Sequence, residues 1–203
     1  KLKMLFKMAL KMAQYNLKII VAGRWIWFVL AALRFFMLLS ISLVLNEPGF
    51  DSSSVYSILF FPGILLAFYP TVFGIQNDAD SRILEILFGI PNYRYKVWLV
   101  RLVMIFLLTW AILYLFCWIG YFGLCPFPVL VMSGQLMYPV VFLGMLAFLM
   151  STMVKNGNGT AVVMIIIGVT LMILTDALDR TQWNVFHNPY AIHDRMHEKA
   201  WEQ

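Results

Sequence analysis

Long apolar runs without charged residues dominate this 203-residue chain and restrict it to one class of fold. Hydrophobic residues make up 62% of the chain and charged residues only 12%, against about 25% charged in an ordinary soluble domain. Several of the runs approach the roughly 20 residues that a helix needs to cross the hydrocarbon core of a bilayer. The short alternating segments of a membrane β-barrel do not occur. We therefore predict an all-α, polytopic membrane protein with a single transmembrane domain.

Five of the apolar runs are candidate membrane spans. They cover residues 25–45, 55–75, 97–121, 127–150 and 160–175. Pro62 and Pro70 interrupt the second run and are expected to kink its helix. The fifth run has 16 residues before Asp176, or about 24 Å of helix, so it is short for a span. Residues 176–203 are polar and contain no further span.

Residues 1–20 precede the first span and have the pattern of an amphipathic helix. Four lysines fall on one side of that helix, and an apolar face lies opposite them. The lysines are Lys3, Lys7, Lys11 and Lys18, and the apolar face includes Leu2, Leu5, Met8 and Met12. A basic stripe opposite an apolar face is typical of a helix that lies on anionic membrane lipids. We predict an interfacial helix here.

The distribution of basic residues predicts the orientation of the chain. Lysine and arginine gather before the first span, between the second and third spans, and between the fourth and fifth spans. The first-to-second connection has no Lys or Arg, and the tail is acidic, with three basic and five acidic residues (3 − 5 = −2). Because basic connections stay in the cytoplasm, the N-terminus is predicted to be cytoplasmic and residues 176–203 to lie outside. The net charge of +5 follows from this asymmetry and does not indicate a nucleic-acid partner.

The polar stretch between the second and third spans, residues 77–92, is the most informative feature for function. Its acidic and basic residues, Asp78, Asp80, Arg82 and Glu85, alternate with an apolar stripe formed by Ile83, Leu84, Ile86 and Leu87. This spacing predicts a short amphipathic helix, which Gly89 and Pro91 would end. Such a helix is too short and too polar to cross a bilayer. We expect it to lie at the cytoplasmic face, where a partner protein contacts it.

Motifs for catalysis and cofactors do not occur. The sequence contains neither the glycine-rich loop that binds nucleotide triphosphates nor the usual zinc or serine hydrolase motifs, so neither enzymatic activity nor a cofactor is predicted for this chain. Cys117 and Cys125 are interpreted as small buried residues. The tail histidines His187, His193 and His197 leave one alternative open, a membrane enzyme or redox subunit that uses them. A scaffold subunit of an envelope complex is a further alternative.

Arg34 lies in the middle of the first span, where a cation is costly unless it meets a partner or water. One interpretation is a contact with the substrate path or with another subunit. The other is a shifted span from which the side chain extends to an interface. The sequence does not decide between these interpretations.

Taken together, these features resemble the permease subunits of type-2 ABC transporters, mostly exporters. In that family an acidic, arginine-containing helix joins the second and third spans, and a proline and basic residues follow it. Residues 80–87 take that place here, followed by Pro91, Arg94 and Arg101, although Arg82-Ile83 replaces the usual Gly-Thr. The sequence Asn188-Pro189-Tyr190 is similar to the segment that precedes a sixth span in the family.

The resemblance implies a function and partners. The helix in residues 77–92 would be the coupling helix, with Asp78, Asp80, Arg82, Glu85 and Leu87 contacting a separate cytoplasmic ATP-binding subunit. A second permease chain, identical or homologous, would complete the substrate path in the inner membrane of a bacterium. A sixth span does not occur in these 203 residues, and we expect it in a longer form of the chain. The substrate is not readable from the apolar spans.

Overall fold

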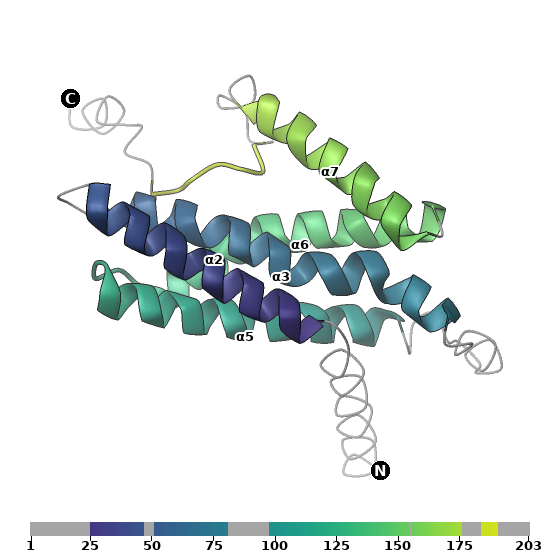
Figure 1. The fold of residues 1–203 in the computed structure, drawn as a ribbon, viewed down its shortest axis with the longest axis horizontal. Coiled ribbons are helices and arrows are strands. Elements are labelled where there is room, and N and C mark those ends of the chain that lie inside the picture. Colours follow the sequence, from purple (N-terminus) through teal and green to yellow (C-terminus); the bar gives the residue numbers. More distant parts are fainter. Residues whose placement is uncertain (1–24, 47–50, 81–97, 155, 176–183, 191–203) are drawn as a thin grey trace, which may run out of the picture.

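The computed structural model describes residues 25–46, 51–80, 98–154, 156–175 and 184–190, and the fold of these residues is helical (Figure 1). The helices are α2 (Trp25–Asn46), α3 (Ser52–Asp80), α5 (Val100–Gly123), α6 (Val129–Val154) and α7 (Gly157–Ile173). No strand occurs in these ranges. The prediction of an all-α fold is confirmed for them. The predicted interfacial helix in residues 1–20 lies outside the described residues.

Four of the helices, α2, α3, α5 and α6, are long and apolar enough to cross a membrane. Their most apolar windows have mean hydropathies between 1.7 and 2.5, which indicates a protein embedded in a membrane. The helix α7 has only 17 residues and is shorter than a typical span. The predicted fifth span therefore stays a prediction.

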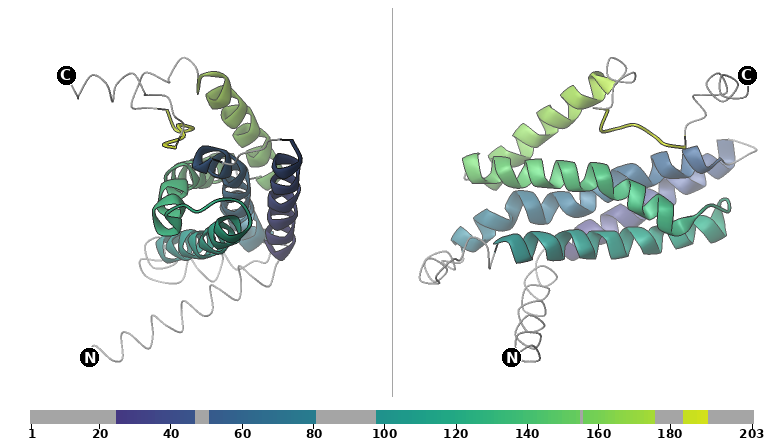
Figure 2. Two further views of the ribbon diagram at one scale, coloured as in Figure 1. Left: turned by 90° about the vertical axis from the view of Figure 1, so that its left-hand side faces the viewer. Right: turned by 180° about the vertical axis from the view of Figure 1, so that it is seen from behind.

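The helix α3 is the centre of the bundle. It contacts each of the other four helices, and 61% of its most apolar window is buried, compared with 11% for α2. Two views agree that α2, α3, α5 and α6 lie side by side, whereas α7 leans away from them (Figures 1 and 2). The core follows α3 along its length. Its fully buried side chains include Phe36, Leu59, Leu66, Leu113, Met132 and Leu136.

The helix α3 differs from expectation at its end and is continuous through its two prolines. The helix α3 continues through Asp80, so the first residues of the predicted coupling segment extend this helix. Pro62 and Pro70 both lie inside α3, and the helix continues through them. A proline removes one backbone donor, and a membrane helix tolerates this loss where it is packed inside the protein, as at these two buried positions.

Successive long helices run in opposite directions and give the bundle two distinct ends (Figure 1). At the Asp51 end, α2 leads into α3 and α5 leads into α6. At the Gly74 end, α3 ends, α5 begins, and α6 leads into α7. The connections 81–97 and 155–156 therefore leave the bundle at the same end. They are the connections that the charge pattern assigns to one side of the membrane.

Close approach of α5 to α6 depends on a glycine. A Cβ placed on Gly144 of α6 would lie 2.7 Å from Cε1 of Phe106, on α5, and 3.7 Å from Cγ2 of Thr71 on α3. Contacts of 2.7 Å are not tolerated in a packed interior, so the aromatic ring or the helix must move. Gly144 thus sets the distance between α5 and α6.

Gly144→Ala is expected to lower stability by about 1–2 kcal/mol because of this overpacking. Gly134, also in α6, is the matched control, since nothing lies within 4 Å of a Cβ placed there. Gly134→Ala should leave stability unchanged or raise it slightly, because alanine favours helix over glycine. Thermal unfolding of the purified chain in one detergent compares the two variants. Equal midpoints would contradict the role given to Gly144.

Candidate functional site

A short segment after α7 is docked on the beginning of α3. We call residues 184–190 the docked segment. The side-chain amide of Asn188 lies 3.0 Å from the Ser53 carbonyl oxygen, 3.1 Å from Ser53 Oγ and 3.1 Å from Ser57 Oγ. Its two amide protons are shared among three acceptors that lie within one turn of α3. Asn188 thereby fixes a segment that is far away in sequence against the Asp51 end of the bundle.

The docked segment is also held by its own turns and by aromatic contacts. The backbone N–H of Tyr190 donates to Asn188 Oδ1, and that of Phe186 donates to Asn184 Oδ1, each at 3.0 Å. These are Asx turns, which stabilise irregular backbone without a helix or a strand. Two ring pairs then join the segment to α3: Tyr190 lies 5.8 Å from Tyr56, and Phe186 lies 5.4 Å from Phe60. The docked segment is therefore packed against α3 as an integral part of the fold.

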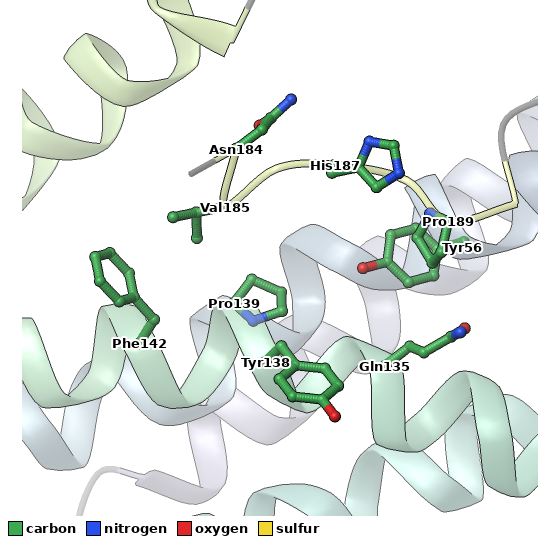
Figure 3. Close-up of a pocket in the computed structure, with 9 residues that line it drawn as sticks. All are labelled: Tyr56, Gln135, Tyr138, Pro139, Phe142, Asn184, Val185, His187 and Pro189. Atoms are coloured by element: carbon green, nitrogen blue, oxygen red, sulfur yellow. The ribbon is translucent and has the colours of Figure 1, made fainter. Parts of the chain in front are cut away.

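A cavity of about 400 Å³ lies between the docked segment, α3 and α6 (Figure 3). Its lining is Tyr56, Gln135, Tyr138, Pro139, Phe142, Asn184, Val185, His187 and Pro189. The walls are mainly aromatic and apolar, with a few amide, imidazole and hydroxyl groups. The buried Oε1 atom of Gln135 has no hydrogen-bond partner. A space of this size and character suits a compact apolar group that also carries a hydrogen-bond donor.

The cavity offers no metal site. His187 lines it and is exposed, but the described part of the chain contains no group of three His, Cys, Asp or Glu residues that could hold a metal ion. His193 and His197 lie outside the described residues. The alternative function based on the tail histidines thus stays an untested prediction.

Cys125 lies at the same end of the bundle, in the turn between α5 and α6. Partial burial, and secondarily the charge of Asp51, raise the pKa of its thiol. A raised pKa leaves less thiolate at neutral pH, and the thiolate is the form that reacts with maleimides. Cys117 is fully buried, so labelling of the folded chain should report on Cys125.

Asp51→Asn is expected to speed maleimide labelling of Cys125 and to shift its pH profile to lower pH. The substitution removes the negative charge but keeps a side-chain oxygen for the Ser52 N–H, which now lies 2.7 Å from Asp51 Oδ1. Stopped-time labelling between pH 6.5 and 9 measures the effect, with Cys125→Ser as the blank. An unchanged profile would show that Asp51 does not influence the thiol.

The opposite end contains a second set of convergent residues, which we call the Gly74 junction: Val72, Gly74, Trp98, Arg101, Phe148 and Ser151. Arg101, at the start of α5, is buried although it is charged, with 9% exposure. Its guanidinium carbon lies 5.8 Å from the centre of the Trp98 ring. A Cβ on Gly74 would lie 3.7 Å from one of its terminal nitrogens, so the guanidinium packs over the bare backbone of α3.

Two further contacts bring α6 into the Gly74 junction. Ser151 donates a hydrogen bond of 2.8 Å to the carbonyl oxygen of Val72, and this contact joins α6 to α3. The Trp98 and Phe148 rings lie 5.8 Å apart and join the beginning of α5 to α6. Three helices thus meet six residues before α3 ends at Asp80. The Gly74 junction therefore ties the last part of α3 to α5 and α6.

The predicted site residues fall in three different situations. Asp78 and Asp80 lie in the last turn and a half of α3, directly beyond the Gly74 junction. Arg82, Glu85 and Leu87 lie outside the described residues, so their role stays a prediction. Arg34 lies in the middle of α2 with its side chain exposed. Arg34 is on the exposed side of α2 at mid-helix, apart from the end of α3 that carries Asp78 and Asp80.

Sequence reasoning missed the two best-defined parts of this geometry. From the sequence, Arg101 is only one of the basic residues that follow the predicted coupling helix, whereas a cation at the start of an apolar span was the available signal for a buried contact. Asn188 was noted only for a family-like tripeptide. Its acceptors in α3 are 131 and 135 residues away, so no local pattern could indicate them.

Comparison with known proteins gives no relative: no protein-family model, no curated protein and no solved structure matches this chain.

Proposed function

We propose that this chain is a permease subunit of an ATP-driven membrane transporter of the type-2 ABC class. The transporter would work as an exporter. The chain would lie in the inner membrane of a bacterium, with its N-terminus in the cytoplasm and α7 as a fifth, short span. ATP hydrolysis would take place on separate cytoplasmic subunits. A second permease chain would complete the path for the substrate.

The observation that carries the proposal is the place where α3 ends. The predicted coupling segment begins within the last residues of α3, and α3 contacts each of the other described helices of the bundle. The Gly74 junction lies six residues before the end of α3 and ties α3 to α5 and α6 through Arg101, Trp98 and Ser151. A partner that pushes on residues 81–92 would therefore move the whole bundle through one helix.

The two ends of the bundle suit different tasks in such a transporter. The Gly74 end carries the basic connections and would face the ATP-binding subunits. The Asp51 end carries the docked segment and the cavity, and would face the outside. We expect the docked segment to rearrange over the cavity, and this movement would open and close the outer end of the substrate path.

Copurification tests the proposal. The chain, tagged at a terminus and extracted from native membranes in mild detergent, should bring down an ATP-binding subunit in a fixed ratio, identified by mass spectrometry. A chain from which residues 81–92 are replaced by a glycine-serine linker of equal length is the control and should lose that subunit while still inserting. Copurified haem or metal without an ATPase would instead support the redox alternative.

A further inference from the structure

The orientation of α2 is fixed by contacts on one side of the helix. The indole N–H of Trp25 donates to the Leu66 carbonyl oxygen at 3.1 Å. The Phe36 ring stacks on the Phe116 ring, with 5.6 Å between the ring centres. Ala32, which lies between Trp25 and Phe36 in the sequence, is fully buried. These contacts span three turns of α2 and hold one face of the helix against α3 and α5. Rotation of α2 to bury a different face would break all of them.

Arg34 lies on the opposite face. At about 100° per residue it points roughly 160° away from both Ala32 and Phe36. The residues that share its face are large, apolar and exposed: Trp27, Leu30, Leu38, Ile41 and Leu45 are between 50% and 78% exposed. We call Trp27, Leu30, Arg34, Leu38 and Ile41 the outward stripe of α2. It is an apolar surface with one cation in its centre.

The cation is far from both ends of the span. Arg34 is nine residues after Trp25 and eleven before Leu45, roughly 14 Å and 16 Å along the helix. Lipid alone would leave the guanidinium in hydrocarbon without a hydrogen-bond acceptor, which membrane helices avoid. A carboxylate at the same depth satisfies both its charge and its paired N–H donors.

The helices in the described part of these 203 residues hold no carboxylate at the depth of Arg34. The ten Asp and Glu residues of the chain all lie outside the apolar windows of α2, α3, α5 and α6 and outside α7. Those in the described part of the chain, Asp51, Asp78 and Asp80, lie beyond the ends of the spans. A second copy seated symmetrically on this face would bring two Arg34 side chains together in the membrane, which like-charge repulsion opposes.

We propose that the outward stripe of α2 binds a transmembrane helix of a different polypeptide, and that an Asp or Glu near the middle of that helix pairs with Arg34. The apolar residues of the stripe supply the packing surface, and the ion pair fixes depth and orientation. Within the proposed transporter this makes the second membrane chain a non-identical one. The contact itself does not require ATP-driven transport.

Photo-crosslinking in native membranes tests this inference. A photoreactive amino acid at Leu38, one helical turn after Arg34 on the same face, should form an adduct with one foreign chain, within an apolar segment that contains Asp or Glu. Arg34→Leu should lower the adduct yield about tenfold, and Arg34→Lys should keep most of it. A probe at Leu115, exposed on α5, is the control and should give a yield that does not depend on residue 34.

Charge exchange gives the decisive outcome. Arg34→Asp should abolish the adduct, and replacing the partner's carboxylate by arginine in the same cells should restore it. Adducts with a second copy of this chain or with lipid only, adducts with a segment that lacks a carboxylate, or a yield unaffected by Arg34→Leu would each overturn the inference. Absence of an ATP-binding subunit would count against the proposed transporter and leave this contact untouched.

Discussion

Replacing Asn188 by leucine is expected to release the docked segment from α3. The variant removes the amide that is shared among the Ser53 carbonyl and the Ser53 and Ser57 hydroxyls, together with the acceptor of the Tyr190 N–H. A neutral hydrogen bond contributes about 0.5–1.5 kcal/mol net, so losing several should cost about 1.5–3 kcal/mol. That corresponds to a roughly tenfold to 100-fold higher population of the open segment.

Hydrogen exchange at the backbone N–H groups of Phe186 and Tyr190 measures this opening. His187→Ala is the matched control: it changes an exposed side chain of the same segment, and the Asn188 contacts stay intact. Exchange should rise in the Asn188→Leu protein and stay near that of the wild type in the His187→Ala protein. Equal protection in both variants would mean that the aromatic pairs alone hold the segment.

Gly74→Leu should be the most damaging single change at the opposite end. A leucine side chain would occupy the space over α3 where the Arg101 guanidinium now lies, and would force a buried cation to move. Overpacking and displacement together should cost about 2–3 kcal/mol and lower the unfolding midpoint by about 4–10 °C. In the proposed transporter this variant should also weaken the connection between the coupling segment and the bundle.

Two controls separate overpacking at the Gly74 junction from a general effect of the substitution. Gly74→Ala adds a methyl group at ordinary contact distance, 3.7 Å from Arg101, and should be close to the wild type. Gly168→Leu places the same large side chain on α7 at a position where nothing lies within 4 Å, and should be tolerated. A Gly168→Leu protein as unstable as Gly74→Leu would contradict this account.

The sequence predicted the class of fold well because that class depends on composition over long runs. Four of the five predicted spans recur as helices that are long and apolar enough to cross a membrane. Boundaries were less predictable. The helix α3 continues to Asp80 because polar residues that follow an apolar run can extend its helix by another turn.

The candidate site was predictable only where charge marked it. Arg34 was identified from its position within an apolar run, but its direction is set by aromatic and hydrogen-bond contacts on the other face of α2. The docked segment and the Gly74 junction depend on side chains that are far apart in sequence. Amphipathic periodicity carries no information about such pairs.

The central claim is that a partner ATPase drives this chain through residues 77–92, and ATP hydrolysis by the purified complex tests it most directly. The complex should be isolated through this chain, placed in lipid nanodiscs, and compared as wild type and Glu85→Lys, with Glu198→Lys in the tail as the control. We expect hydrolysis in the wild type and the control, and at least about a tenfold loss in Glu85→Lys, where a reversed charge would meet the ATP-binding subunit. Equal hydrolysis in all three complexes, or a purified chain that brings no ATPase with it, would contradict the account.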